Sequence, residues 1–220
     1  VNVSECDFST GDDSMAGGYW HDMVIDRCRF NSSCNGLRMI MPSENVLVSG
    51  CTFVGPGRSP HRTTSDKGGD MLHAMIFEPG GWGDAPGTLS DIYIKDCTAD
   101  KVLSPFCMTL LDDNHCTDVT IENYHATNCR RMALSVKSWG IASTDKVTIR
   151  NSSFSYIGIP EPGLGEKIAS MPFDQWPYFP SYGAYFRNVA EVVLDNVAFS
   201  TVGPDDRDDV FTDNVGSLTR

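Results

Sequence analysis

The sequence repeats itself at seven places, and this repeat constrains the fold more than any other feature. Aligned without gaps, the segments carry hydrophobic residues at their first and third positions and mostly polar residues beside them. This two-residue alternation predicts β-strands with one buried face. The segments are VNVSECDF (1–8), MVIDRCRF (23–30), VLVSGCTF (46–53), IYIKDCTA (92–99), VTIENYHA (119–126), VTIRNSSF (147–154) and VVLDNVAF (192–199).

The spacing between the segments favours parallel strands. Measured between sixth positions, successive segments lie 22, 23, 46, 27, 28 and 45 residues apart, whereas an antiparallel hairpin returns within about two to five residues. Each strand therefore returns in the same direction after a full coil, and equivalent positions stack. The sequence predicts an all-β fold, a right-handed single-stranded parallel β-helix of about seven coils, as a single domain over residues 1–220.

A second hydrophobic strand follows the repeat segment in most coils, and only one such strand occurs within each long spacing. We therefore interpret the spacings of 46 and 45 as single coils with insertions. The insertions are rich in Gly and Pro, as expected of ordered loops beside a groove. The second strands begin at Leu37, Met75, Met108, Leu134 and Ala184, and the insertions span 55–69, 78–87 and 158–182.

The eight cysteines divide into two groups. Cys6, Cys28, Cys51 and Cys97 share the sixth position of the repeat, where Val, Ser and Tyr also occur, so we expect them to be core thiols rather than disulfides. The disulfide state of the others stays open, and a Cys116–Cys129 bridge is one alternative. They are Cys34, Cys107, Cys116 and Cys129. Since no C-x-x-C motif occurs, we expect no metal site and no cofactor.

Charge and hydropathy exclude two classes of partner. The formal net charge is −12, which argues against nucleic acid because its phosphates require a basic surface. No hydrophobic run approaches the roughly 18 residues that cross a bilayer, so we expect no membrane partner. The chain begins without Met or a signal-like segment, and we expect a monomeric segment of a longer chain.

Two adjacent carboxylates are the main candidates for chemistry. Asp12 and Asp13 follow Gly11 between two predicted strands. Glycoside hydrolysis needs one carboxyl group to protonate the leaving oxygen and another to activate water or to attack, and crowding of two carboxylates raises one pKa. A solvated Gly-Asp-Asp turn is the alternative interpretation.

The string CDFSTGDDSMA (6–16), placed on this repeat, resembles the Gly-Asp-Asp motif of the polygalacturonase family, glycoside hydrolase family 28, which has the pectin lyase-like fold. The closing stretch from Asp205 resembles later coils of that family. The resemblance implies a secreted or periplasmic inverting hydrolase of pectin-like polysaccharides, active in cell-wall degradation. It implies that Asp12 is the general acid and that Asp13 holds and activates water. A third aspartate, in an Asn-Thr-Asp motif one coil earlier, would precede residue 1.

The chain departs from the family pattern at two motifs. The family places Gly-His-Gly one coil after the aspartates, and here Asn35 stands at the histidine position. The Arg-Ile-Lys motif of the next coil is replaced by a stretch, 72–77, without Arg or Lys, and Lys137 lies two coils too late to supply it. Because the basic pair binds the uronate carboxylate in the family, these departures affect galacturonate specificity more than hydrolysis.

Other polar and aromatic residues are candidates for substrate binding. We expect Asn35 and Arg38 to shape a subsite, with His73 lining the groove and His61 and Arg62 reaching it from the first insertion. Solvated charge and ordinary packing are the alternatives for these side chains. Aromatic faces stack on sugar rings, and loop anchoring is the alternative for each Trp. The tryptophans predicted to bind substrate are Trp20, Trp82 and Trp139.

Two other functions stay open. A polysaccharide lyase on the same fold would need a Ca²⁺-binding carboxylate cluster and a base that abstracts a proton. A non-catalytic carbohydrate-binding or adhesion β-helix would need neither, and the missing third aspartate and Asn35 favour it. A polysaccharide is the expected partner in all three cases.

Overall fold

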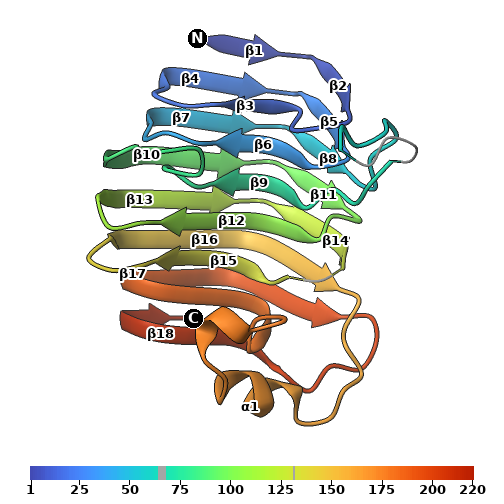
Figure 1. The fold of residues 1–220 in the computed structure, drawn as a ribbon, viewed down its shortest axis with the longest axis vertical. Helices are drawn as coiled ribbons and strands as arrows, with labels where there is room; N and C mark the ends of the chain where they lie inside the picture. Colours follow the sequence, from blue (N-terminus) through green and yellow to red (C-terminus); the bar gives the residue numbers. More distant parts are fainter. Residues whose placement is uncertain (64–67, 131) are drawn as a thin grey trace.

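The predicted repeats form strands that pair in parallel at equivalent positions. In this computed structural model, which describes residues 1–63, 68–130 and 132–220, Val48 pairs with Ile25 on one side and with Ile94 on the other. Every pairing between the named strands is parallel within these ranges. The strands make one strongly curled sheet of 18 strands (Figure 1), which is consistent with a β-solenoid.

The first ladder of strands contains the hydrophobic start of each repeat segment, and its register is the one that the sequence predicts. It consists of β1 (Asn2–Ser4), β4 (His21–Asp26), β7 (Glu44–Ser49), β10 (Gly87–Lys95), β13 (Asn114–Glu122), the first part of β16 (Ser143–Tyr156) and the middle of β17 (Ser181–Thr201).

A second and a third ladder complete each turn of the chain. The second contains β2 (Asp7–Thr10), β5 (Arg29–Ser32), β8 (Thr52–Val54), β11 (Thr98–Asp100), β14 (His125–Cys129) and the ends of β16 and β17. The third contains β3 (Met15–Gly17), β6 (Asn35–Met39), β9 (His73–Phe77), β12 (Ser104–Leu110), β15 (Leu134–Ser138), the start of β17 and the start of β18 (Asp208–Thr219). The end of β18 continues into the first ladder, where it pairs with the middle of β17. The chain visits the ladders in the same order on successive turns.

The corner between the first two ladders lies where the sequence alternation breaks. The fifth residue of every repeat segment has a left-handed backbone with φ between 48° and 60°. This conformation reverses the side-chain alternation and lets the sixth residue point back into the core. The seven corner residues are Glu5, Arg27, Gly50, Asp96, Asn123, Asn151 and Asn196.

The core consists of columns of like side chains. The rings of Phe8, Phe30 and Phe53 stack with centroid distances of 5.0 and 4.8 Å. At the sixth position, three of the four predicted core cysteines are buried, but Cys6 is exposed because no described strand packs on the outer side of its coil. All eight cysteines are free thiols in the structure, including Cys116 and Cys129.

The insertions lie where the sequence places them, between β8 and β9, β9 and β10, and β16 and β17. Residues 64–67 of the first insertion lie outside the described residues. The third insertion is not only a loop, because it contains the helix α1 (Leu164–Ala169) and the 3-10 helix η1 (Phe173–Gln175). Leu164 and Ile168 of α1 are buried, so one face of the helix is enclosed.

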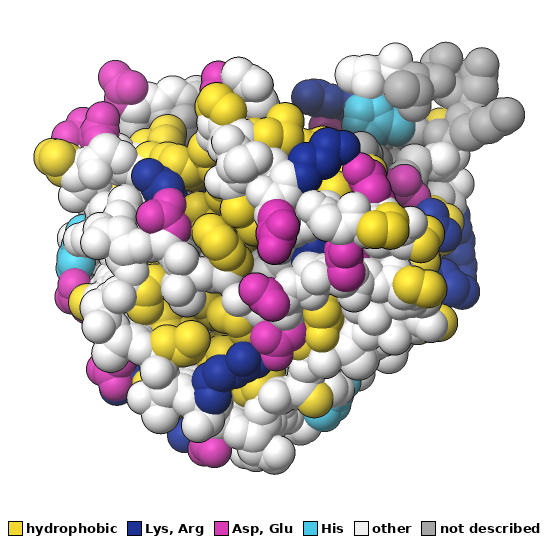
Figure 2. Space-filling model, turned by 90° about the horizontal axis from the view of Figure 1, so that it is seen from below, with side chains coloured by type: hydrophobic (Ala, Val, Ile, Leu, Met, Phe, Trp, Pro, Cys, Tyr) yellow, Lys and Arg dark blue, Asp and Glu magenta, His cyan; other side chains and the backbone are white. Residues whose placement is uncertain are grey.

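The two ends of the stack carry the chain termini, with β1 at one end and β18 at the other (Figure 1). Seen from the β18 end, hydrophobic side chains show between polar and charged ones (Figure 2). Val197, Phe199 and Val215 are only partly buried there. Within the described residues, no helix has the length and hydrophobicity needed to cross a membrane.

Candidate functional site

The Gly-Asp-Asp turn joins β2 to β3 and lies directly against the first insertion. A Cβ atom added to Gly11 would come 1.9 Å from the carbonyl oxygen of Pro60. The backbone nitrogen of Arg62 donates a hydrogen bond to the Gly11 carbonyl oxygen at 3.2 Å. Only glycine allows this approach, so Gly11 is the position that brings His61 and Arg62 to the carboxylates.

Asp12 is the more accessible of the two carboxylates, with 37% of its side chain exposed. Its Oδ2 atom lies 2.8 Å from Nε of Arg62. Its backbone oxygen accepts hydrogen bonds from the hydroxyl groups of Thr10 at 2.6 Å and Ser32 at 2.7 Å. The backbone is thus fixed from two coils, and the carboxylate is paired with a guanidinium from the first insertion.

Asp13 is nearly enclosed, with 5% of its side chain exposed. Its Oδ1 atom accepts a hydrogen bond from Nδ2 of Asn35 at 2.8 Å, and its Oδ2 atom lies 3.2 Å from Nη1 of Arg38. These charge-assisted bonds satisfy both oxygens of the buried carboxylate. Asp13 is therefore a rigid hydrogen-bond acceptor at the base of the site.

Arg38 connects Asp13 to the second insertion. Its Nε atom donates to Oε1 of Glu78 at 2.7 Å, and its guanidinium carbon lies 5.1 Å from the centre of the Trp82 ring. Trp82 is 61% exposed, so it presents an aromatic surface beside the carboxylates. The sequence pattern places Glu78 only at the start of an insertion and gives no signal for this contact.

Asn35 stands at the position where the resembled family has histidine. It connects the carboxylate of Asp13 to the side chain of His73 by hydrogen bonds. Its side chain is buried, and its Oδ1 atom lies 2.9 Å from Nδ1 of His73. Because Nδ2 of Asn35 donates to the Asp13 carboxylate, Oδ1 must be the acceptor, and Nδ1 of His73 carries the proton. Asn35 thus fixes the tautomer of His73.

One group of side chains near the carboxylates has the ligand types of a metal site. One ligand atom each from Asp12, Cys34 and His61 lies within 4.8 Å of the other two. Nitrogen, sulfur and oxygen together are the ligands that Zn²⁺ accepts. Burial, followed by hydrogen bonding to Asp13, raises the pKa of the Cys34 thiol to about 12, so metal binding there would have to displace a tightly held proton.

Two of the three predicted tryptophans make their contacts elsewhere. Trp20 packs against the core and lies close to Gly17. The Trp139 ring lies 4.0 Å from the ring of Phe173 and 4.3 Å from the guanidinium of Arg187. These contacts anchor a turn and the third insertion, which leaves Trp82 as the predicted tryptophan beside Asp12 and Asp13.

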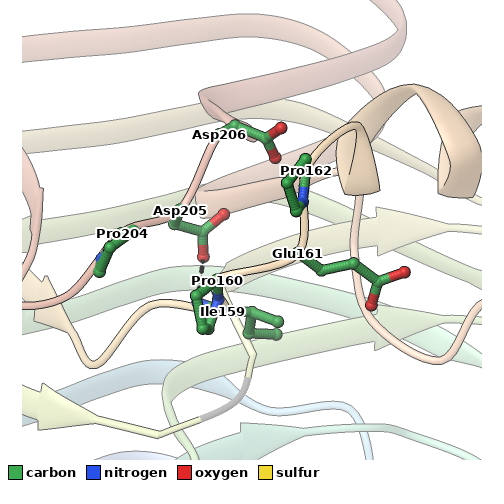
Figure 3. A pocket seen from close by; sticks show the side chains of 7 residues that line it. All are labelled: Ile159, Pro160, Glu161, Pro162, Pro204, Asp205 and Asp206. Carbon is green, nitrogen blue, oxygen red and sulfur yellow. Dashed lines mark hydrogen bonds between the residues drawn. The ribbon is translucent and has the colours of Figure 1, made fainter.

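A surface pocket of about 340 Å³ lies between the start of the third insertion and the segment that joins β17 to β18 (Figure 3). Its carboxylates already have structural roles, since Asp205 accepts a hydrogen bond from the backbone of Ile159 at 3.0 Å and Asp206 accepts one from Gly163. The carboxylates of Asp205 and Asp206 therefore hold the third insertion in place, and the pocket lies where the insertion meets the segment that carries them. Its lining residues are Ile159, Pro160, Glu161, Pro162, Pro204, Asp205 and Asp206.

A further cluster, around the thiol of Cys107, is not among the sites predicted from the sequence. Lys137 on β15 donates a hydrogen bond to Sγ of Cys107 on β12 at 3.3 Å, and His73 lies near enough to lower the pKa of this thiol. The sequence contains a signal for this site, because Lys137 is the basic residue that appears two coils after the expected motif.

Comparison with protein-family models, curated proteins and solved structures finds no match to this chain.

Proposed function

We propose that this chain is a polygalacturonase-like hydrolase that cleaves a polysaccharide, with Asp12 and Asp13 as the carboxylates that carry the chemistry. In this proposal the curled sheet is a right-handed single-stranded parallel β-helix of about seven coils, of the pectin lyase-like kind. Parallel crossovers are right-handed in nearly all proteins, which supports that handedness. The substrate class implies action in a secreted or periplasmic location.

The observation that carries the proposal is the gathering of two adjacent carboxylates, an arginine and an exposed tryptophan at one place. The turn between β2 and β3 supplies Asp12 and Asp13, β6 supplies Arg38, and the second insertion supplies Trp82. Carboxylates beside an aromatic face are what a glycosidase needs to protonate a leaving oxygen and to hold a sugar ring.

The different exposures of the two carboxylates support different roles. Asp12, 37% exposed, can contact a substrate, whereas Asp13, 5% exposed, can fix the position of Asn35 and orient a water molecule. In the structure, the guanidinium of Arg62 forms an ion pair with the Asp12 carboxylate and neutralises its charge. For Asp12 to donate a proton, Arg62 has to turn away, and its side chain, 67% exposed, has room to do so.

Arg62 also suggests which polysaccharide is bound. An arginine on a surface insertion next to the carboxylates can exchange its ion pair with Asp12 for one with a substrate carboxylate. This exchange would free Asp12 only when an acidic sugar is present. A pectin-like, acidic polysaccharide is therefore the best-supported substrate, despite the net charge of −12.

A non-catalytic carbohydrate-binding solenoid is the second candidate, because one specific observation favours it. Both carboxylates already have charged partners, Asp12 with Arg62 and Asp13 with Arg38. A lyase is less well supported, because the metal-ligand group at Asp12 includes sulfur and nitrogen, whereas Ca²⁺ prefers oxygen ligands.

The decisive experiment replaces Asp12 with Asn and measures the release of reducing ends from a panel of acidic and neutral polysaccharides. The longest natural chain that contains this segment should be used. The proposal predicts that Asp12→Asn abolishes turnover while the circular dichroism spectrum and melting temperature stay unchanged. Asp174→Asn, an exposed aspartate in η1, is the matched control and should keep full activity.

The outcomes separate the candidate functions. Turnover by Asp12→Asn at the rate of the unmodified protein would refute the role of Asp12. Binding of a polysaccharide in affinity electrophoresis, without release of reducing ends by the unmodified protein, would favour the non-catalytic candidate. An unsaturated product that absorbs in the ultraviolet would favour the lyase.

A further inference from the structure

A second cluster of reactive side chains lies on the third ladder, next to the carboxylates but outside the proposed hydrolytic chemistry. It brings together Asn35 on β6, His73 on β9, Cys107 on β12 and Lys137 on β15. The four strands are consecutive neighbours in the ladder. A nucleophile, a base and a residue that orients the base thus come from adjacent turns, which is the arrangement of activated nucleophiles in enzymes.

The orientation of His73 is fixed by its partner on the preceding strand. Since Nδ1 of His73 donates to Oδ1 of Asn35 at 2.9 Å, the other ring nitrogen, Nε2, is the one without a proton. Nε2 can accept the thiol proton and then holds it as a donor to the thiolate. The order Asn, His, Cys gives each group a defined role in moving one proton.

Hydrogen-bond donors close to the Cys107 thiol favour its ionised form. From β15, Lys137 Nζ donates to Sγ of Cys107 at 3.3 Å and to the hydroxyl of Thr109 at 2.8 Å. Ser135 lies in register with Cys107, and its buried hydroxyl, 1% exposed, has no hydrogen-bond partner among the described residues. A buried hydroxyl without a partner, next to a thiol, can donate to a thiolate or to a molecule bound there.

These contacts change the acidity of Cys107. Burial alone would raise the pKa of its thiol, but the charge of Lys137 and the proximity of His73 outweigh burial and lower that pKa to about 5. By contrast, burial raises the pKa of the Cys116 and Cys129 thiols to about 12. Cys107 therefore differs from other buried cysteines of this chain in its neighbours and not in its burial.

We propose that Cys107 is a nucleophilic thiolate site whose substrates are small hydroperoxides, with hydrogen peroxide as the simplest. The cysteine is 5% exposed, which favours a small reagent over a polymer or a peptide. The ammonium of Lys137 and the hydroxyl groups of Thr109 and Ser135 are donors that can hold the two peroxide oxygens. The site does not depend on the hydrolytic role of Asp12.

The reaction balances with the groups present and one molecule of peroxide. The Cys107 sulfur attacks one peroxide oxygen, the S–O bond forms and the O–O bond breaks. The sulfur loses two electrons and becomes a sulfenic acid, and the peroxide is reduced. The departing hydroxide takes the proton that His73 received from the thiol and leaves as water. Lys137 stabilises the thiolate before the attack and the negative charge on the leaving oxygen during it.

The primary experiment uses the unmodified folded protein. It is treated with a small excess of hydrogen peroxide near neutral pH in the presence of dimedone, which traps sulfenic acids, and each cysteine is then quantified by peptide mass spectrometry. Cys107 should be trapped at least about tenfold faster than the exposed Cys6, because reaction follows the thiolate population. Cys116 is the buried control and should not react.

Variants test the contributions of the neighbours. Measured at about pH 5, Lys137→Met and His73→Gln should each slow trapping at Cys107 by about fivefold or more, because raising the thiol pKa from about 5 by a unit or more lowers the thiolate population at that pH. Lys137→Arg should restore most of the rate. Asp12→Asn should leave trapping unchanged, so failure of the hydrolytic proposal and failure of this one are distinguishable.

A second measurement reports the thiolate without requiring reagent access. The ultraviolet absorbance of thiolates is followed with pH in the unmodified protein and in Cys107→Ser, and the difference should appear with a midpoint at about pH 5. The absence of a Cys107-dependent transition between acid and neutral pH would overturn the thiolate assignment. A normal transition combined with trapping at Cys6 ahead of Cys107 would overturn the hydroperoxide site.

Discussion

Arg207 and Asp205 form a buried ion pair, with Nη2 of the guanidinium 2.6 Å from Oδ2 of the carboxylate and the two side chains 3% and 0% exposed. Arg207 also donates to the backbone oxygens of Phe179 at 3.0 Å and Ser181 at 3.3 Å. Together with the bond from Ile159 to Asp205, the pair fastens both ends of the third insertion to the last coil.

We therefore predict that Asp205→Asn destabilises the protein at neutral pH by about 3–5 kcal/mol, because it leaves the buried Arg207 charge without its counter-ion. Urea denaturation followed by circular dichroism measures this loss. Asp208→Asn, an exposed position three residues later, is the matched control and should change the free energy of unfolding by less than about 0.5 kcal/mol. Equal effects of the two variants would contradict the role of the pair.

The same pair predicts a pH dependence. Burial raises the pKa of the Asp205 carboxyl, but hydrogen bonds and charge from Arg207 outweigh it and hold the pKa below its ordinary value of 3.8. A carboxyl group with a lowered pKa stabilises the fold above its unfolded-state pKa and loses this contribution as the pH falls through the folded-state value. The stability difference between the unmodified protein and Asp205→Asn should be constant above about pH 5 and should shrink below about pH 4.

Arg38→Met tests the base of the candidate site. The variant removes the partner of the enclosed Asp13 and of Glu78, so we expect a loss of about 1.5–3 kcal/mol in the free energy of unfolding. Because the guanidinium lies over the Trp82 ring, the fluorescence of Trp82 should also change, as measured against Trp82→Phe. A second substitution, Asp13→Asn, should recover part of the lost stability, and additive losses would contradict direct coupling of the two side chains.

Gly11→Ala tests whether the glycine of the Gly-Asp-Asp turn positions the first insertion. The added methyl group would meet the carbonyl oxygen of Pro60 at 1.9 Å, so the segment that carries His61 and Arg62 has to move. We expect faster proteolysis within residues 55–63 and, under the proposed function, a lower rate of turnover. Gly165→Ala is the control, because a methyl group there meets its nearest neighbour at 3.3 Å. Unchanged proteolysis of Gly11→Ala would show that the insertion does not depend on the glycine.

The parallel strands and their register could be predicted because both follow from one-dimensional information. Positions such as Val48 face a core that contains the same position of the neighbouring coils, so the hydrophobic pattern specifies which residues pair. The helix α1 escaped prediction because its six residues are too few to establish a helical period within a segment rich in Gly and Pro.

The candidate site could be predicted only in part, because its side chains come from different coils and from insertions. The adjacent Asp12 and Asp13 are visible in the sequence, but the contact of Arg38 with Glu78 depends on how an insertion folds back. Cys107 was missed because it lies between Phe106 and Met108, where it looks like one more core residue. Strand alternation instead turns it away from the core, and Lys137, which is in register with Thr109, reaches it from two positions further along the neighbouring strand.

The corner residues allow the prediction that links sequence and fold most directly. Asn123 has φ = 50°, and its Nδ2 atom donates to Oδ1 of Asp96, the corner residue of the preceding coil, at 2.7 Å. A β-branched side chain strongly disfavours this conformation, whereas glycine adopts it readily. Asn123→Val should therefore lower the free energy of unfolding by about 1–2 kcal/mol more than Asn123→Gly does. Because both variants lose the side-chain hydrogen bond to Asp96, their difference isolates the backbone conformation, and equal melting in urea would show that the corner does not require a left-handed residue.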